Sequence, residues 1–172
     1  IREHYLPKQA NGELPKTLIG SIVSIADKLD TIVGCISIGL VPTGSQDPYG
    51  LRRQATGVLR IIADRKWDIS LETLLEIVTS LYQTLDIELE NQEKVAIELK
   101  EFFQLRASYL LKELNVEQDV INAVVHRAIG NFDYTIAKAK LLSEKRNDEN
   151  FKHIQEALVR ALNLSDKAEG TT

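Results

Sequence analysis

The stretch that decides the fold is residues 42–62, PTGSQDPYGLRRQATGVLRII, which begins as a constrained loop and continues as a helix. Gly44 permits a positive φ, as a tight turn requires. Asp47 is a suitable N-cap, and Pro48 suits the first helical position, where its missing N–H costs nothing. Apolar residues then recur at helical spacing: Leu51, Ala55, Val58, Leu59 and Ile62. We therefore expect a helix that begins at Pro48 and buries this stripe.

The same spacing predicts further helices along the chain. From Lys16 to about Ile36, one face carries Leu18, Ile22, Ile25, Ala26, Leu29, Val33 and Ile36. Ser70 is a plausible cap for a helix over 71–85, and other helical patterns cover 91–114, 117–129, 133–144 and 148–164. All four prolines precede residue 60, and no alternating strand pattern of useful length occurs. The predicted fold class is all-α.

The acidic segment DIELENQEK, residues 86–94, marks a candidate boundary near Asp86. We expect a helical region over 1–86 and a second, C-terminal helical region over 87–172. The sequence starts with isoleucine and contains no methionine. We therefore expect an excised fragment, with a truncated C-terminal region.

Composition narrows the function classes. The chain has 172 residues, a net charge of −4 and a pI near 5.5, so it is not a general nucleic-acid coat and any contact with nucleic acid must be local. A single cysteine forms no internal disulfide, which favours a reducing compartment, the cytoplasm by default. The longest apolar stretch is interrupted by Asp27, Lys28 and Asp30, which argues against a membrane span.

Cationic residues follow the loop at positions that suggest separate roles. At about 100° per residue, Arg53 and Arg60 lie opposite the apolar stripe, with Arg65 and Lys66 just beyond. Two interpretations fit this strip. It positions a polynucleotide backbone, or it is an ordinary solvated helix face.

Arg52 sits on the flank of the apolar stripe and is expected to play an internal role. Asp30 falls at the margin of the preceding helix's apolar face, and Asp27 lies further toward solvent. A carboxylate at a core margin needs a partner, because burying an unpaired charge is costly. We expect Arg52 to pair with Asp30 or Asp27 between the two helices.

Candidate reactive groups are sparse. His4 and Asp27 are two possible ligands of a helical His/Asp metal site that would need further ligands; the alternative is that His4 packs or caps and Asp27 pairs. The loop over 42–48 lacks the Gly-x-x-x-x-Gly-Lys spacing of a triphosphate loop, and Asp47 would repel an anion. Cys35 lies among apolar residues and is expected to be a core residue. We predict no catalytic residue in this chain.

Three ordered motifs carry a family resemblance. They are Glu-His-Tyr-Leu-Pro at Glu3–Pro7, Ala-Asp-Lys-Leu-Asp at Ala26–Asp30, and the segment Pro42–Arg53, PTGSQDPYGLRR. In this order they resemble the beta subunit of the bacterial two-subunit glycyl-tRNA synthetase. Two later stretches, EFFQLRASYLLKEL at 101–114 and DVINAVV at 119–125, look similar to the same subunit further along.

The resemblance implies an HD-like helical domain, followed by a further helical subdomain, within an enzyme of two alpha and two beta subunits. That enzyme joins glycine to its tRNA with ATP, its alpha subunit carries the aminoacylation site, and its beta subunit binds tRNA and supports assembly. With this resemblance, Arg53, Arg60, Arg65 and Lys66 are the candidate tRNA-binding residues of this chain. His4 and Asp27 resemble two metal-ligand positions of HD hydrolases, but the His-Asp dipeptide is absent, so we treat them as vestigial and expect no cofactor in this chain. The competing functions are a metal-dependent HD phosphohydrolase and a purely structural helical scaffold.

Overall fold

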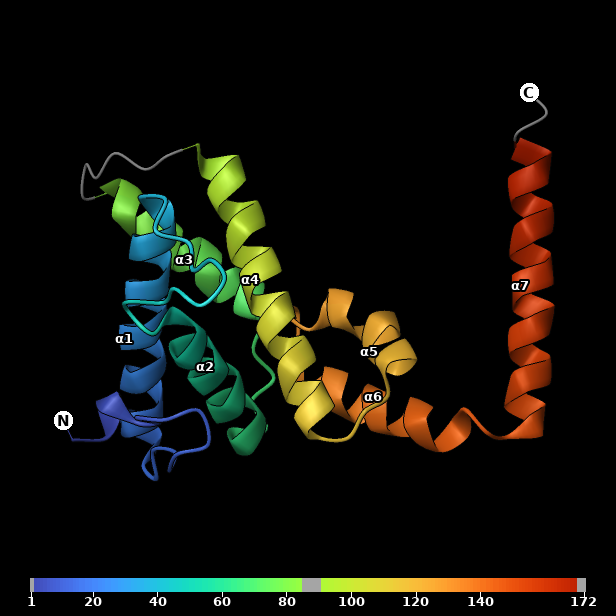
Figure 1. The fold of residues 1–172 in the computed structure, drawn as a ribbon, viewed down its shortest axis with the longest axis horizontal. Helices are drawn as coiled ribbons and strands as arrows, with labels where there is room; N and C mark the ends of the chain where they lie inside the picture. The colour runs from blue at the N-terminus through green and yellow to red at the C-terminus, as the bar shows by residue number, and fades with distance from the viewer. Residues whose placement is uncertain (1, 85–90, 170–172) are drawn as a thin grey trace.

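The computed structural model describes residues 2–84 and 91–169, and within them the fold is all-α, as predicted (Figure 1). The described part contains no β-strand, and Thr43 and Gln46 form an isolated β-bridge. The helices, in chain order, are the 3₁₀ turn η1 (Arg2–Tyr5), α1 (Leu18–Ser37), α2 (Leu51–Arg65), α3 (Leu71–Thr84), α4 (Gln92–Glu113), α5 (Gln118–Val124), the 3₁₀ turn η2 (Val125–Arg127), α6 (Phe132–Lys145) and α7 (Glu149–Glu169).

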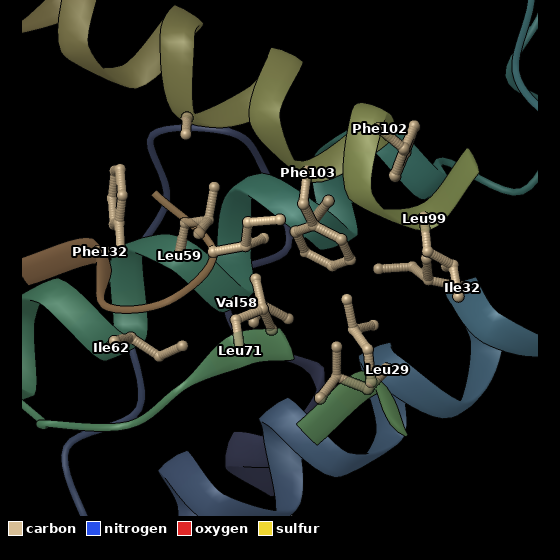
Figure 2. Packing of buried hydrophobic residues seen from close by; sticks show 14 of the residues in the cluster. Leu29, Ile32, Val58, Leu59, Ile62, Leu71, Leu99, Phe102, Phe103 and Phe132 are labelled. Atoms are coloured by element: carbon tan, nitrogen blue, oxygen red, sulfur yellow. The ribbon is translucent and has the colours of Figure 1, made fainter. Parts of the chain in front are cut away.

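The main core lies where α1, α2, α3 and α4 meet (Figure 2). Phe103 of α4 is fully buried and points into the space between Val58 of α2 and Ile32 of α1. Phe132, at the start of α6, closes the same cluster from the other end. The predicted stripe of α2 is confirmed, because each of its five apolar residues is at most 1% exposed.

A second, smaller core follows the end of α4. Leu111 packs there with residues of α5 and with Ala139 of α6. The predicted helix over 117–129 is shorter than expected, because α5 ends at Val124 and the chain continues as the 3₁₀ turn η2. The helix α7 stands apart from the bundle in Figure 1, and its large apolar side chains from Ile154 to Leu164 are exposed.

The boundary predicted near Asp86 lies in residues 85–90, outside the described part of the chain. The main core nevertheless contains residues from both sides of this position, since α4 packs against α1 and α2. The division into 1–86 and 87–172 stays a prediction.

The helix after the decisive loop begins later than predicted. Residues 47–50 form a turn in which the Gly50 N–H donates to the Asp47 carbonyl, so α2 starts at Leu51 and not at Pro48. Asp47 still caps the helix, because its carboxylate accepts from the backbone N–H groups of Leu51 at 2.7 Å and Arg52 at 3.0 Å. Gly44 has the expected positive φ, +51°.

Removing the cap should destabilise the chain. We expect Asp47→Ala to lower the free energy of unfolding by about 1 kcal/mol, because two amide groups at the start of α2 lose a charged acceptor. Urea titration followed by circular dichroism measures the change. Ser45→Ala, at an exposed position of the same loop, is the control and should leave stability unchanged. Equal stability of both variants would contradict a capping role.

The buried face of α1 differs from the predicted one in its first half. Ile25, Leu29, Val33 and Ile36 are buried as predicted, but Leu18, Ile22 and Ala26 are exposed. In their place the inner face carries Ser21, Ser24 and Lys28, each at most 4% exposed. The reason is that the neighbouring amino-terminal segment offers backbone carbonyls, which hydroxyl and ammonium groups can bind and aliphatic side chains cannot.

Candidate anion site beside the amino-terminal turn

Two of the four cations in the predicted strip hold the chain that precedes α1. The Arg65 guanidinium donates to the Pro15 carbonyl at 2.7 Å and to the Ser21 hydroxyl at 3.1 Å. The Arg60 guanidinium donates to the carbonyls of Ala10 and Gly12. Both side chains are partly buried, although Arg60 lies opposite the apolar stripe and would face solvent on an isolated helix. These two arginines therefore attach the amino-terminal loop to α2.

The other two cations of the strip remain exposed. Arg53 lies in the first turn of α2, and Lys66 follows its last residue. The Arg53 guanidinium forms no hydrogen bond or ion pair with any residue that the structure describes. Arg53 and Lys66 are separated by nearly the whole length of α2, so the predicted four-residue strip is not a continuous free surface. Contact of any of these residues with tRNA stays a prediction.

The predicted ion pair of Arg52 does not form within the described residues. The hydroxyl of Tyr82, on α3, lies 2.9 Å from the Asp30 carboxylate and 3.0 Å from its carbonyl oxygen, and so supplies the partner that Asp30 needs. Arg52 lies near Arg106 of α4 instead. Burial lowers the pKa of Arg106, and the charge of Arg52 lowers it further. Helical spacing does not identify this partner, because Tyr82 lies 52 residues away from Asp30 in the sequence.

The contact between Tyr82 and Asp30 predicts a pH effect. Burial, together with the hydrogen bond to Asp30, raises the pKa of Tyr82 from its ordinary value of 10 to about 12. The folded chain thus retains a phenol proton that the unfolded chain loses, and stability should fall as pH rises from 10 toward 12. Tyr82→Phe should lack this part of the fall, as urea titrations at several pH values can measure. Tyr134→Phe, at an exposed position, is the control and should fall like the unsubstituted chain.

A surface pocket of about 540 Å³ opens where the amino-terminal turn meets α1 and α2. Three cationic side chains and one carboxylate line it, and its lining residues are Tyr5, Pro7, Lys8, Asp27, Lys28, Thr31, Arg53 and Gln54. Gly57 of α2 makes this arrangement possible, because a Cβ there would lie 3.0 Å from Pro7 and 3.3 Å from the Lys28 stem. The three family-like motifs each contribute residues to this one place.

Lys28, like Tyr5 and Lys8, lines this pocket but was not among the residues predicted from the sequence to form a site. It is only 4% exposed, and its ammonium donates to the His4 carbonyl at 3.0 Å and to the Ser24 hydroxyl at 2.8 Å. Burial lowers the pKa of Lys28, which the charge of Asp27 partly offsets and the charge of Arg53 reinforces. A signal was available, since Lys28 follows Ile25 by three residues and precedes Ile32 by four, which places it on the buried helix face.

The residues around His4 and Asp27 do not fit a divalent metal. Within the described residues, no group of three or more His, Cys, Asp or Glu side chains is arranged to hold one. The His4 carbonyl already accepts from the Lys28 ammonium, and the charges of Lys28 and Arg53 would repel a divalent cation. The pocket is suited to an anion instead.

The remaining candidates behave as structural or surface residues. Cys35 packs against the main core, and burial raises the pKa of its thiol, which disfavours the reactive thiolate. Trp67 also packs against that core, while His126 and His153 are exposed on separate helices. None of the helices in the described ranges is both long enough and apolar enough to cross a membrane.

Fold and site together define an all-α helical bundle with a cationic pocket assembled from three separate sequence motifs. The family described as glycyl-tRNA synthetase beta subunit matches residues 1–126. The chain is 57% identical over 169 residues to the glycine–tRNA ligase beta subunit of Oceanobacillus iheyensis, and 43% identical to those of Halalkalibacterium halodurans and Bacillus subtilis. These matches cover 97–98% of this chain and 23–24% of each relative.

The chain therefore belongs to the glycyl-tRNA synthetase beta subunit family, as its three motifs predicted. It spans about a quarter of the length of the curated relatives that it matches.

Proposed function

We propose that this chain is the part of a glycine–tRNA ligase beta subunit that contributes to tRNA binding and to subunit assembly. In this proposal the alpha subunit carries the chemistry that joins glycine to tRNA with ATP. The enzyme contains two alpha and two beta subunits and works in the cytoplasm, and the chain itself holds no cofactor. We also propose that the helical region over 1–86 is an HD-like domain.

The observation that carries the tRNA part is the free cationic group of Arg53 at the pocket. A guanidinium that no described residue engages, beside Lys8 and the buried Lys28, is a local positive site on a protein of net charge −4. Such a site suits a local contact with the phosphate backbone and does not suit a general nucleic-acid coat.

The assembly part is supported by apolar side chains that the bundle leaves exposed. On the outer face of α1, Ile19 is 75% exposed, Ile22 is 52% exposed and Val23 is 46% exposed. Large apolar residues that cluster at the surface mark places where another protein surface packs. These exposed apolar residues lie on α1, whereas the free guanidinium of Arg53 lies on α2. Assembly and tRNA binding can therefore be tested by separate substitutions.

We expect the double variant Arg53→Glu with Lys66→Glu to weaken tRNA binding by the whole enzyme about 10-fold and to reduce its salt dependence. Assembly with the alpha subunit should not change, because both side chains are exposed and outside the core. Ile22→Asp should have the opposite effect. It should lower the yield of the complex with the alpha subunit, while the enzyme that does assemble should bind tRNA with unchanged affinity. Binding by anisotropy, assembly by size-exclusion chromatography and glycine charging are measured separately.

The outcomes separate the proposed functions. Unchanged tRNA affinity in the double variant would remove Arg53 and Lys66 from the tRNA-binding surface. Loss of both assembly and binding in either variant would favour a purely structural scaffold. The phosphohydrolase alternative has no supporting observation, because the residues around His4 and Asp27 do not fit the metal that it requires.

A further inference from the structure

We propose that the pocket beside η1 binds one nucleotide of single-stranded RNA, with its phosphate on Lys28, Arg53 and Lys8 and its base stacked on Tyr5. This inference rests on the proposed function and specifies the part of tRNA that this chain recognises. It predicts an unpaired nucleotide as the ligand, not a stretch of duplex.

Lys28 forms the floor of the phosphate site. An ammonium has three N–H donors, and within the described residues two of them are used, by the His4 carbonyl and the Ser24 hydroxyl. These two bonds fix the side chain in one position. Asp27 also lines the pocket, but within the described residues no salt bridge joins its carboxylate to this ammonium, so the third donor is not used there. A phosphate oxygen can accept from the third donor and balance the positive charge of Lys28.

Arg53 forms the outer wall of the same site. Its side chain folds back over Gly50, where a guanidinium nitrogen lies 2.7 Å from the position that a Cβ would occupy. Arg53 and Lys28 line the same pocket, and the charge of Arg53 lowers the pKa of Lys28. Two neighbouring cations repel each other unless an anion lies between them, and the planar fork of arginine matches two phosphate oxygens. Lys8 adds a third, exposed cation at the rim.

Tyr5 offers a surface for the base. Its side chain is 64% exposed at the edge of the pocket, and the His4 ring supports it at 3.8 Å between ring centres. An exposed aromatic ring next to a phosphate site is the arrangement on which unpaired bases stack, whatever their identity. A base inside a duplex is already stacked on both faces and cannot use this ring.

Asp27 limits what the pocket accepts. Its carboxylate shares the lining with the three cations, so a second phosphate group would meet a negative charge. A single phosphodiester is favoured over a polyphosphate, and a ribose hydroxyl can donate to this carboxylate. The volume of about 540 Å³ lies within the range of small-ligand pockets, about 300–1,000 Å³.

The test uses the whole enzyme, with glycine tRNA and inorganic phosphate as probes. Arg53→Gln should weaken tRNA binding about 10-fold, lower its salt slope by about 1 and abolish phosphate binding detected by ³¹P NMR. Tyr5→Ala should weaken tRNA binding about 10-fold through lost stacking, with salt slope and phosphate binding unchanged. Tyr5→Phe should restore tRNA affinity. Lys112→Gln, an exposed cation in the last turn of α4, should match the unsubstituted enzyme.

The outcomes distinguish this inference from the proposed function. If tRNA binds the unsubstituted enzyme tightly but Arg53→Gln and Tyr5→Ala leave the affinity unchanged, the pocket is not an RNA site, and tRNA binding lies elsewhere. If phosphate binding depends on Arg53 in that case, the ligand is a free phosphate compound, and the RNA part is wrong. If Tyr5→Phe is as weak as Tyr5→Ala, stacking is excluded. If an enzyme whose beta subunit lacks the part that corresponds to this chain still binds tRNA with unchanged affinity, the proposed function itself fails.

Discussion

Phe103→Ala is expected to lower the free energy of unfolding by about 3–5 kcal/mol, the largest effect of any substitution considered for this chain. Phe103 is fully buried in the main core, where side chains of α1, α2 and α4 surround its ring (Figure 2). Alanine would remove most of this apolar contact and leave a cavity between three helices. Close packing on all sides limits how far the neighbours can relax into it.

Urea titration measures this effect, and a second residue of the same helix serves as the control. Leu105 is also a large apolar residue of α4 but is 52% exposed. Leu105→Ala should change stability by less than about 0.5 kcal/mol. Similar losses in both variants would show that helix α4 responds to truncation in general, and would contradict the central position of the Phe103 ring.

Arg65→Ala is expected to lower the free energy of unfolding by about 2 kcal/mol, although Arg65 was predicted to face tRNA. Its guanidinium holds the Pro15 carbonyl and the Ser21 hydroxyl, and both would lose a charged donor. Since Pro15 and Ser21 are buried, water replaces that donor only incompletely. The amino-terminal loop should then separate from α2 more often, and a protease should cut residues 8–14 faster.

Lys66→Ala is the matched control, because this neighbouring cation is exposed at the end of α2. It should change neither the urea midpoint nor the rate of cleavage. Arg65→Ala with unchanged stability but weakened tRNA binding would restore Arg65 to the tRNA-binding surface and contradict its structural role. Loss of stability without faster cleavage would show that the loop is held by other contacts, such as those of Arg60.

Helix positions followed from the sequence wherever a periodic pattern and a cap coincided. The predicted cap Ser70 accepts from the Thr73 N–H at 3.2 Å, and α3 begins at Leu71. Asn91 similarly caps α4, which spans nearly the predicted 91–114. Both signals are local, because caps and apolar spacing depend on residues within a few positions of each other. The start of α2 was predicted three residues too early. Asp47 caps the helix, but the chain first forms a turn over 47–50, so the helix begins at Leu51 and not at Pro48.

The partners of polar side chains were predicted less well. Arg60 lies opposite the apolar stripe of α2, with Arg65 just beyond, and on an isolated helix Arg60 would face solvent. The amino-terminal loop, about 50 residues earlier, covers that face and offers its carbonyls. Helical spacing carries no information about a segment so distant in sequence, so the same pattern fitted both a solvated face and a nucleic-acid strip.

The sequence by itself determined the helical class, most helix boundaries, the apolar stripe of α2 and, through three short motifs, the family. Only the tertiary structure decided which charges are free, placing Arg53 and Lys28 at one pocket and committing Arg60, Arg65 and Asp30 elsewhere. The physical reason is a difference in range. Helix formation is governed by neighbours along the chain, whereas the pairing of a charge depends on whichever distant segment folds against it.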